Sequence, residues 1–127
     1  MAVRTEISRS YHIEAAHRLP NVPPGHKCAR LHGHSFEITL HVQGELAPKL
    51  GWILDFAEID RAFEPLFSQL DHNYLNDVPG LDNPTSELLA RWVLERVRLP
   101  AGRLRAVSIA ETCSSRCTVY ADDDAAD

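Results

Sequence analysis

The stretch CARLHGHSFEITLHV, residues 28–42, decides the fold because its second half alternates strictly between apolar and polar side chains. A period of two is typical of a half-buried β-strand, whose successive side chains point to opposite faces. His32 and His34 share the parity of the apolar residues Phe36, Ile38, Leu40 and Val42. We therefore expect both imidazoles on the inward face, with Cα atoms about 7 Å apart at a rise of roughly 3.3 Å per residue.

A third histidine, His17, ends an earlier alternating stretch that begins near Val3. It shares a parity with Ile7, Tyr11, Ile13 and Ala15, whereas Arg9 breaks the apolar pattern. Taken alone, each histidine is more simply interpreted as a core residue, but pairing of the two strands would bring the three imidazoles together. Three neutral imidazoles suit Zn²⁺ and leave a fourth coordination position for water or substrate.

The length of 127 residues predicts one domain, which we place at residues 1–121, followed by a disordered acidic tail at residues 122–127. The formal net charge of −5 argues against a general nucleic-acid-binding surface. No apolar run approaches the roughly 20 residues that cross a bilayer, and a signal-peptide core is not recognised. A cytoplasmic location is therefore the default expectation. The three cysteines, an odd number, fit reduced thiols better than a disulfide framework.

A first helix is predicted after the turn region at residues 44–51 and a short strand at residues 52–54. Asp55 is the expected N-cap, and Glu58 three residues later completes a capping box. Pro65 is expected to kink or end this helix. Its apolar positions have helical spacing and are expected in the core: Phe56, Ile59, Phe63, Leu66 and Leu70.

A second helix is predicted to begin with Asn83 as its cap and Pro84 as its first residue. Its expected buried stripe is Leu88, Leu89, Trp92, Val93 and Val97. The next strand gives Glu111 the same parity as its apolar residues, and Ser114-Ser115 turns the chain into a last strand near residues 118–120. The order ββααββ, in which helices follow a hairpin rather than alternate with strands, indicates an α+β domain.

Cys28 lies in a loop that leads directly into the strand of His32 and His34. A thiol near a bound cation, with Lys27 and Arg30 beside it, is expected to carry more thiolate. Cys28 could ligate the metal, or act as nucleophile or base, and we favour one of the last two because three histidines already suffice for an open site. Cys113 and Cys117 match neither a zinc nor a redox CxxC pattern and are interpreted as structural thiols.

Two further groups of side chains suit proton transfer or ligand binding. In Asp71-His72, the carboxylate can fix the imidazole tautomer and raise its basicity, although such pairs are also common on surfaces. An inward-facing Glu111 needs a partner, such as the adjacent N–H groups of a guanidine-like ring edge. A basic cluster near the metal would attract a phosphorylated substrate, or is ordinary surface charge: Arg18, His26, Lys27 and Arg30.

These residues together resemble the 6-pyruvoyl-tetrahydropterin synthase superfamily, and within it the carboxy-forming bacterial members of the queuosine pathway. The resemblance runs from about Tyr11 to Cys117. The segments that carry it are EAAHRLP (14–20), GHKCARLHGHSF (25–36), GWILDF (51–56), LDHNYLN (70–76), NPTSE (83–87) and ETC (111–113).

The resemblance implies the tunnelling fold, with an antiparallel four-stranded sheet, two helices on one face, and assembly into a homohexamer with active sites at subunit interfaces. It implies that His17, His32 and His34 bind Zn²⁺. It also implies roles for four more groups: Cys28 as catalytic thiol, Asp71 and His72 as its partner dyad, and Glu111 as the anchor of the pterin ring. Lys27 and Arg30 are candidate contacts of the triphosphate.

Three residues separate Cys28 from His32, the short spacing that resembles the carboxy-forming members. The resemblance therefore implies a lyase that converts 7,8-dihydroneopterin triphosphate to 6-carboxy-5,6,7,8-tetrahydropterin with release of acetaldehyde and triphosphate. One alternative is the pyruvoyl-forming reaction, which releases no acetaldehyde. Another is a zinc-stabilised module without catalysis, which predicts unfolding on chelation.

Overall fold

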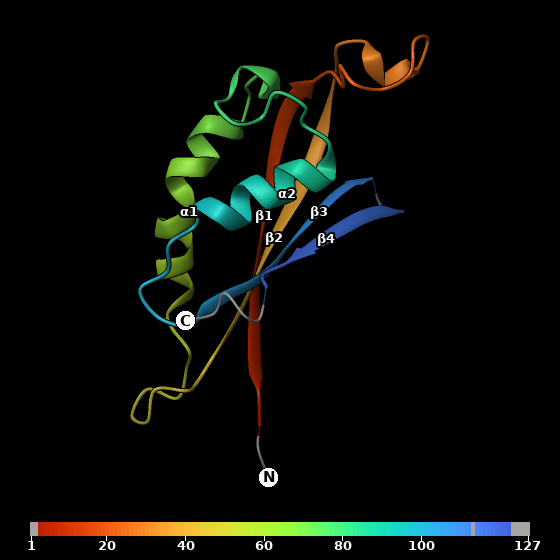
Figure 1. The fold of residues 1–127 in the computed structure, drawn as a ribbon. Coiled ribbons are helices and arrows are strands. Elements are labelled where there is room, and N and C mark those ends of the chain that lie inside the picture. Colours follow the sequence, from red (N-terminus) through yellow and green to blue (C-terminus); the bar gives the residue numbers. More distant parts are fainter. Residues whose placement is uncertain (1–2, 113, 123–127) are drawn as a thin grey trace.

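Two long antiparallel strands form the frame of the molecule (Figure 1). The computed structural model describes residues 3–112 and 114–122, so Cys113 and the predicted tail beyond residue 122 lie outside the described residues. The elements follow in the order β1 (Thr5–His17), β2 (His32–Gly44), α1 (Phe56–Leu70), α2 (Ser86–Arg96), β3 (Arg103–Thr112) and β4 (Ser115–Tyr120). The predicted α+β class and the order ββααββ are confirmed.

The strands form one antiparallel sheet in the order β1-β2-β3-β4, and both helices pack on the same face of it (Figure 1). In the register of β1 and β2, Ile13 lies opposite Phe36, and His17 lies opposite His32. In β2, the apolar residues of this parity, including Phe36, Ile38 and Leu40, are fully buried, whereas Ile7 and Tyr11 of β1 are half-buried. The alternation in the sequence therefore predicts the correct face for both strands.

The helices contribute most of the predicted apolar residues to the core, with one exception in each. Phe56 is 43% exposed and Leu88 is 40% exposed, because each lies in the first turns of its helix, off the face that meets the sheet. Ala90 is buried in α2 instead. The buried helical residues are Ile59, Phe63, Leu66, Leu70, Leu89, Ala90, Trp92 and Val93.

Arg9, which interrupts the apolar parity of β1, is explained by a contact with α1. Its Nε and Nη2 atoms each lie 3.0 Å from a carboxylate oxygen of Asp60. Tyr11 donates a 2.6 Å hydrogen bond to the same carboxylate and stacks on Phe63, with ring centroids 4.4 Å apart. The charged side chain on the inward parity thus fastens the first helix to the edge strand.

Helix boundaries differ from the prediction in two places. Helix α1 continues through Pro65 to Leu70, so the proline does not end it. Helix α2 is capped by Thr85, whose Oγ1 accepts from the Leu88 N–H at 3.1 Å, and not by Asn83. The helix starts later because the Pro84 carbonyl is held by His17.

The connection between β2 and α1 also differs in part. Residues 52–54 are bends rather than a strand, since the Trp52 carbonyl accepts from the Ala47 N–H and closes a local loop. Asp55 caps α1 as predicted, through a 2.9 Å bond from the Ala57 N–H. Glu58 does not complete a capping box, because its carboxylate pairs with Arg61. In the described part of the chain, no helix is long and apolar enough to cross a membrane.

Candidate functional site

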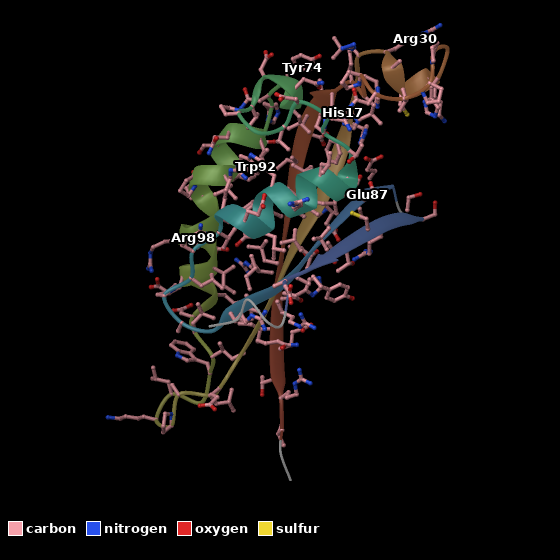
Figure 2. All side chains as sticks on the ribbon, in the orientation of Figure 1. His17, Arg30, Tyr74, Glu87, Trp92 and Arg98 are labelled. Atoms are coloured by element: carbon pink, nitrogen blue, oxygen red, sulfur yellow. The ribbon has the colours of Figure 1, made fainter. Side chains whose placement is uncertain are left out.

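The three histidines predicted from strand parity converge at one end of the β1–β2 hairpin. His17 and His32 face each other across the strands, and His34 lies opposite Ala15 on the same face. One ring nitrogen from each histidine lies within 4.8 Å of the others, an arrangement that can hold a metal ion. Figure 2 shows His17 at this end of the sheet, with Glu87 of α2 nearby and Arg30 further out on the loop.

Backbone carbonyls fix the orientation of all three imidazole rings. The Nδ1 atom of His17 lies 2.8 Å from the Pro84 carbonyl oxygen, that of His32 lies 2.8 Å from the Arg30 carbonyl, and that of His34 lies 3.0 Å from the Ser35 carbonyl. A carbonyl can only accept, so each Nδ1 carries the hydrogen. Every Nε2 atom is therefore left with a free lone pair.

The distance between two of these lone pairs fits a shared cation. The Nε2 atoms of His17 and His34 are 3.2 Å apart, and neither has a hydrogen to donate when both Nδ1 atoms are protonated. Two nitrogens bound at 2.0–2.1 Å to one tetrahedral zinc lie about 3.3 Å apart. The donor set and its spacing therefore suit a metal ion better than a bond between the rings.

The environment of His17 favours the neutral form that metal binding requires. Its side chain is 2% exposed, and its ring contacts those of His32, His34 and Phe36. Burial lowers the pKa of His17, and the neighbouring His32 and His34 lower it further, against the opposing effect of the Pro84 carbonyl. A neutral imidazole is thus present at the buried corner of the site.

Cys28 and Glu111 border the same pocket as two of the histidines. The pocket has a volume of about 490 Å³ and is lined by Lys27, Cys28, His32, His34 and Glu111. Cys28 sits in a short 3-10 turn, Lys27–Ala29, and is half-buried. The structure thus brings the predicted thiol and carboxylate to one cavity beside the three imidazoles.

Glu111 is held from two sides. Its Oε1 atom accepts from the Ser86 hydroxyl at the start of α2, and its Oε2 atom lies 4.0 Å from Nε2 of His34. Glu111 also borders a second hollow of about 200 Å³, which includes Glu87 and Cys117. The inward position of Glu111 that strand parity predicts agrees with this placement.

Two supporting groups were not predicted from the sequence: the Ser86 hydroxyl, which holds Glu111, and the Pro84 carbonyl, which holds His17. The motif NPTSE at the start of α2 contains both residues and was the available indication of them.

Asp71 and His72 form the predicted pair but do not line this pocket. Asp71 Oδ2 lies 2.9 Å from His72 Nδ1, and Asp71 Oδ1 accepts from the Glu14 N–H at 2.9 Å. The bond from Glu14 is the largest of the effects that hold the pKa of Asp71 below its ordinary value. The His72 N–H donates to the Glu14 carbonyl at 2.6 Å. The dyad is therefore fixed along the outer edge of β1.

The backbone at His72 is unusual for a residue other than glycine. Its φ of 58° lies in the left-handed region, which L-residues occupy at a cost and which is enriched at functional sites. Its side chain is 76% exposed. The strained turn presents the imidazole to solvent rather than to the pocket of its own chain.

The predicted basic cluster is only partly gathered at the pocket. Lys27 lines it, whereas Arg30 is exposed on the surrounding loop. The backbone of Arg18 is held by two bonds with the Asn76 side chain, one from its N–H and one to its carbonyl. Of the four residues predicted to form this cluster, Lys27 is the one that lines the cavity.

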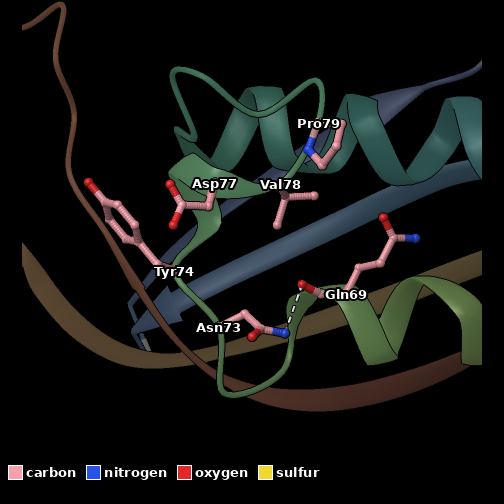
Figure 3. A pocket seen from close by; sticks show the side chains of 6 residues that line it. All are labelled: Gln69, Asn73, Tyr74, Asp77, Val78 and Pro79. Atoms are coloured by element: carbon pink, nitrogen blue, oxygen red, sulfur yellow. Dashed lines mark hydrogen bonds between the residues drawn. The ribbon is translucent and has the colours of Figure 1, made fainter.

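Other features lie away from the three histidines. A pocket of about 290 Å³ beside the end of α1 is lined by Gln69, Asn73, Tyr74, Asp77, Val78 and Pro79 (Figure 3). Cys117 is a half-buried free thiol whose pKa is raised chiefly by burial, which fits the prediction of a structural cysteine. Cys113, predicted to have the same role, lies outside the described residues.

Comparisons with known proteins agree with the observed fold. The 6-carboxy-5,6,7,8-tetrahydropterin synthase of Synechocystis sp. is 38% identical over 122 residues, covering 90% of this chain and 92% of that protein. The dihydroneopterin monophosphate aldolase of Pyrococcus furiosus is 40% identical over 68 residues, 54% of this chain and 56% of the relative. The structure of Caenorhabditis elegans 6-pyruvoyl tetrahydropterin synthase superposes with a TM-score of 0.83 at 23% identity, covering 94% and 97% of the two chains.

The likeness to the nematode structure establishes the shared architecture, and the sequence comparisons establish the family. The family model described as 6-pyruvoyl tetrahydropterin synthase matches residues 6–122, which include every element of the sheet and both helices. This chain therefore belongs to the 6-pyruvoyl tetrahydropterin synthase family.

Proposed function

We propose that the chain is a zinc-dependent carbon–carbon lyase of queuosine biosynthesis. It would convert 7,8-dihydroneopterin triphosphate to 6-carboxy-5,6,7,8-tetrahydropterin and release acetaldehyde and triphosphate. The observation that carries the proposal is a pocket of about 490 Å³ lined by a thiol, a carboxylate and two of the three histidines that can hold a metal ion. The similarity to the 6-carboxy-5,6,7,8-tetrahydropterin synthase of Synechocystis supports this reaction over others of the family.

His17, His32 and His34 are the proposed ligands of Zn²⁺. Their free Nε2 lone pairs and the 3.2 Å spacing between two of them suit a tetrahedral ion, and three ligands leave room for substrate. When bound, zinc would act as a Lewis acid on the side-chain hydroxyls of the substrate and acidify the adjacent C–H bonds. The ion that the chain carries in the cell is tested directly by metal analysis of the purified protein.

Cys28 is the proposed base, and Asp71 with His72 the proposed second proton-transfer pair. The Cys28 thiol borders the pocket, so it can take a proton from the substrate side chain. The Asp71 carboxylate, 2.9 Å from His72 Nδ1, holds that ring in the tautomer whose Nε2 can exchange a proton. Rearrangement of the side chain and loss of triphosphate leave two adjacent carbonyl groups on it. Addition of water and cleavage of the carbon–carbon bond between them then give the carboxylate and acetaldehyde.

Glu111 is the proposed anchor of the pterin ring. A carboxylate can accept from two adjacent N–H groups, and the Ser86 hydroxyl holds Glu111 in place for this purpose. The positive charge of Lys27 at the rim favours a phosphorylated substrate, and Arg30 on the same loop is proposed to contact the triphosphate.

A homohexamer with active sites between subunits is the proposed assembly. The Asp71-His72 pair does not line the pocket of its own chain but is presented along the outer edge of β1. A neighbouring copy would bring the pair to the pocket, as the resemblance implies. The free thiols of Cys28 and Cys117 are compatible with the cytoplasmic location that the sequence predicts.

Incubation of the zinc-loaded protein with 7,8-dihydroneopterin triphosphate, followed by mass identification of the products, tests the proposal. The expected products are the 6-carboxy pterin, acetaldehyde and triphosphate in equal amounts. A pterin that retains its three-carbon side chain, without acetaldehyde, would assign the pyruvoyl-forming reaction instead. Absence of turnover combined with unfolding on chelation would identify a zinc-stabilised module.

A further inference from the structure

The loop that carries Cys28 is built from a tight turn followed by a single helical turn. The His26 N–H donates to the Pro23 carbonyl at 3.1 Å, and Gly25, the third residue of this turn, has a φ of 84°. Proline in the second position and glycine with positive φ in the third are typical of a type II turn. The sequence PPGH thus delivers His26 to the start of the 3-10 turn Lys27–Ala29.

The imidazole of His26 caps that 3-10 turn. Its Nδ1 atom accepts from the Cys28 N–H at 3.0 Å, while its own backbone is extended, with φ −67° and ψ 137°. An N-cap residue has extended dihedrals and a side-chain acceptor for one of the first free N–H groups of the helical turn. Because a backbone N–H can only donate, His26 must carry its ring hydrogen on Nε2.

Both backbone polar groups of Cys28 therefore have hydrogen-bond partners in the segment between β1 and β2. The Cys28 carbonyl accepts from the Leu19 N–H at 2.8 Å, which ties the turn to the segment that follows β1. The Cys28 N–H is bound by His26. Among the described hydrogen bonds of residues 27–29, only the one that the Cys28 N–H donates to His26 depends on a side chain, so one substitution can remove it.

We infer that His26 is a positioning residue that fixes the Cys28 thiol relative to the three histidines through this cap. The inference rests on the proposed function in giving Cys28 a part in the reaction, but the cap itself is a property of the loop. His26 is exposed and does not line the pocket, so it acts through Cys28 rather than on the substrate. Small displacements of a reacting group cost rate steeply, and an exposed cap leaves the global fold intact.

Two substitutions separate the effect of the capping hydrogen bond from any effect of the imidazole ring itself. In His26→Ala the acceptor is lost, whereas Asn in His26→Asn can still accept from the N–H two residues later, as in an Asx-turn. Asn cannot transfer protons, so it restores only the positioning role. His12→Ala is the matched control, since His12 is also an exposed histidine but pairs with Glu37.

The experiment measures kcat, KM and bound zinc for the zinc-loaded variants, together with NMR order parameters of residues 27–29. We expect His26→Ala to lower kcat about tenfold with KM and zinc content unchanged, and to lower the order parameters of the turn. His26→Asn is expected to recover kcat to within about threefold of the parent protein and to keep the turn ordered.

Equal impairment of the Ala and Asn variants would overturn the inference, because the imidazole itself would then be required. It would also be overturned if His26→Ala behaved like the parent protein and like His12→Ala. Should the parent protein fail to turn over the pterin, the proposed reaction is wrong, yet the order parameters still test the cap. A turn as ordered with Ala as with His would then refute it.

Discussion

His17 donates its Nδ1 hydrogen to the carbonyl of Pro84, 2.8 Å away, although the two residues are far apart in the sequence. The bond joins the end of the first strand to the segment that leads into α2. It fixes the ring of His17 with Nε2 facing His32 and His34. The proposed metal centre thus depends on the docking of a helix that contributes no ligand to it.

Removal of one imidazole is expected to weaken metal binding strongly. We predict that His34→Ala weakens zinc affinity by at least about 100-fold, because two histidines and water replace a three-nitrogen site. Competition with a zinc-sensitive chelator measures the affinity. His41→Ala is the matched control, since His41 lies on the same strand but bonds to Ser108. Equal affinities in the two variants would remove His34 from the site.

Loss of the Cys28 thiol is expected to separate metal binding from turnover. Cys28→Ala should retain zinc and lose about 10²–10⁴-fold in kcat, the usual contribution of a positioned acid–base group. Steady-state kinetics with metal analysis checks both, and Cys117→Ala provides a thiol control outside this pocket. A fully active Cys28→Ala protein would refute the assignment of the base.

The carboxylate of Glu111 is expected to contribute chiefly to substrate affinity. We predict that Glu111→Gln raises the dissociation constant for a pterin ligand about 30-fold. The charged carboxylate has two accepting oxygens, whereas the neutral amide has one accepting oxygen and an NH2 group that can only donate. Ligand titration by fluorescence measures the change. Glu37→Gln, whose parent carboxylate pairs with His12, is expected to bind normally. Unchanged affinity in Glu111→Gln would place the ring elsewhere.

The bonds of Asp60 to Arg9 and Tyr11 make part of the stability pH-dependent. The hydrogen bond from Arg9, then that from Tyr11, holds the pKa of Asp60 below its ordinary value of 3.8. A carboxyl with a lowered pKa stabilises the fold fully above that ordinary value and loses this effect as the pH falls below it. Asp60→Asn should therefore cost about 1 kcal/mol at pH 7, a value limited by the exposure of the pair, and less at pH 3.

Urea unfolding at the two pH values tests the role of Asp60, with Glu58→Gln as the control for an exposed pair on the same helix. The difference between the parent protein and Asp60→Asn should shrink on acidification. A difference that stays constant or grows would show that the charge of Asp60 does not stabilise the fold.

Two glycines with nearly equal φ angles allow backbone strain to be separated from crowding. A methyl group added at Gly51 (φ 74°) would meet open space, whereas at Gly102 (φ 72°) a Cβ would lie 2.8 Å from Ile53 and 3.1 Å from the Gln43 carbonyl. We expect Gly51→Ala to cost about 1 kcal/mol and Gly102→Ala at least about 1 kcal/mol more. Equal urea-unfolding midpoints for the two variants would show that the crowding at position 102 does not affect the free energy of unfolding.

The sequence was sufficient to predict which face of the sheet a strand residue occupies, because that depends on the alternation of side-chain types alone. Strand parity predicted that His17, His32 and His34 share a face, because register and alternation fix which way a strand residue points. The same reasoning placed Glu111 correctly. These predictions succeeded because a half-buried sheet leaves each strand only two orientations.

Contacts between distant segments could not be predicted in this way. Arg9 interrupts the apolar pattern of β1 because it pairs with Asp60 of α1, which is distant in the sequence. Helix α2 starts later than predicted because His17 binds the backbone carbonyl of Pro84, and a backbone carbonyl is present at every residue. The position of Asp71-His72 likewise depends on the main chain of Glu14. Hydrogen bonds to the backbone are compatible with almost any sequence at the acceptor position.

All three imidazoles lie at one end of the β1–β2 hairpin, between positions 17 and 34, whereas the apolar core extends along the rest of that hairpin, β3 and both helices. A metal ion that bridges β1 and β2 closes a loop that strand pairing has already closed, so it adds little chain-entropy stabilisation. We therefore expect the proposed ion to be exchangeable: dialysis against a chelator should yield a folded protein that can be reloaded with zinc, cobalt or another probe metal.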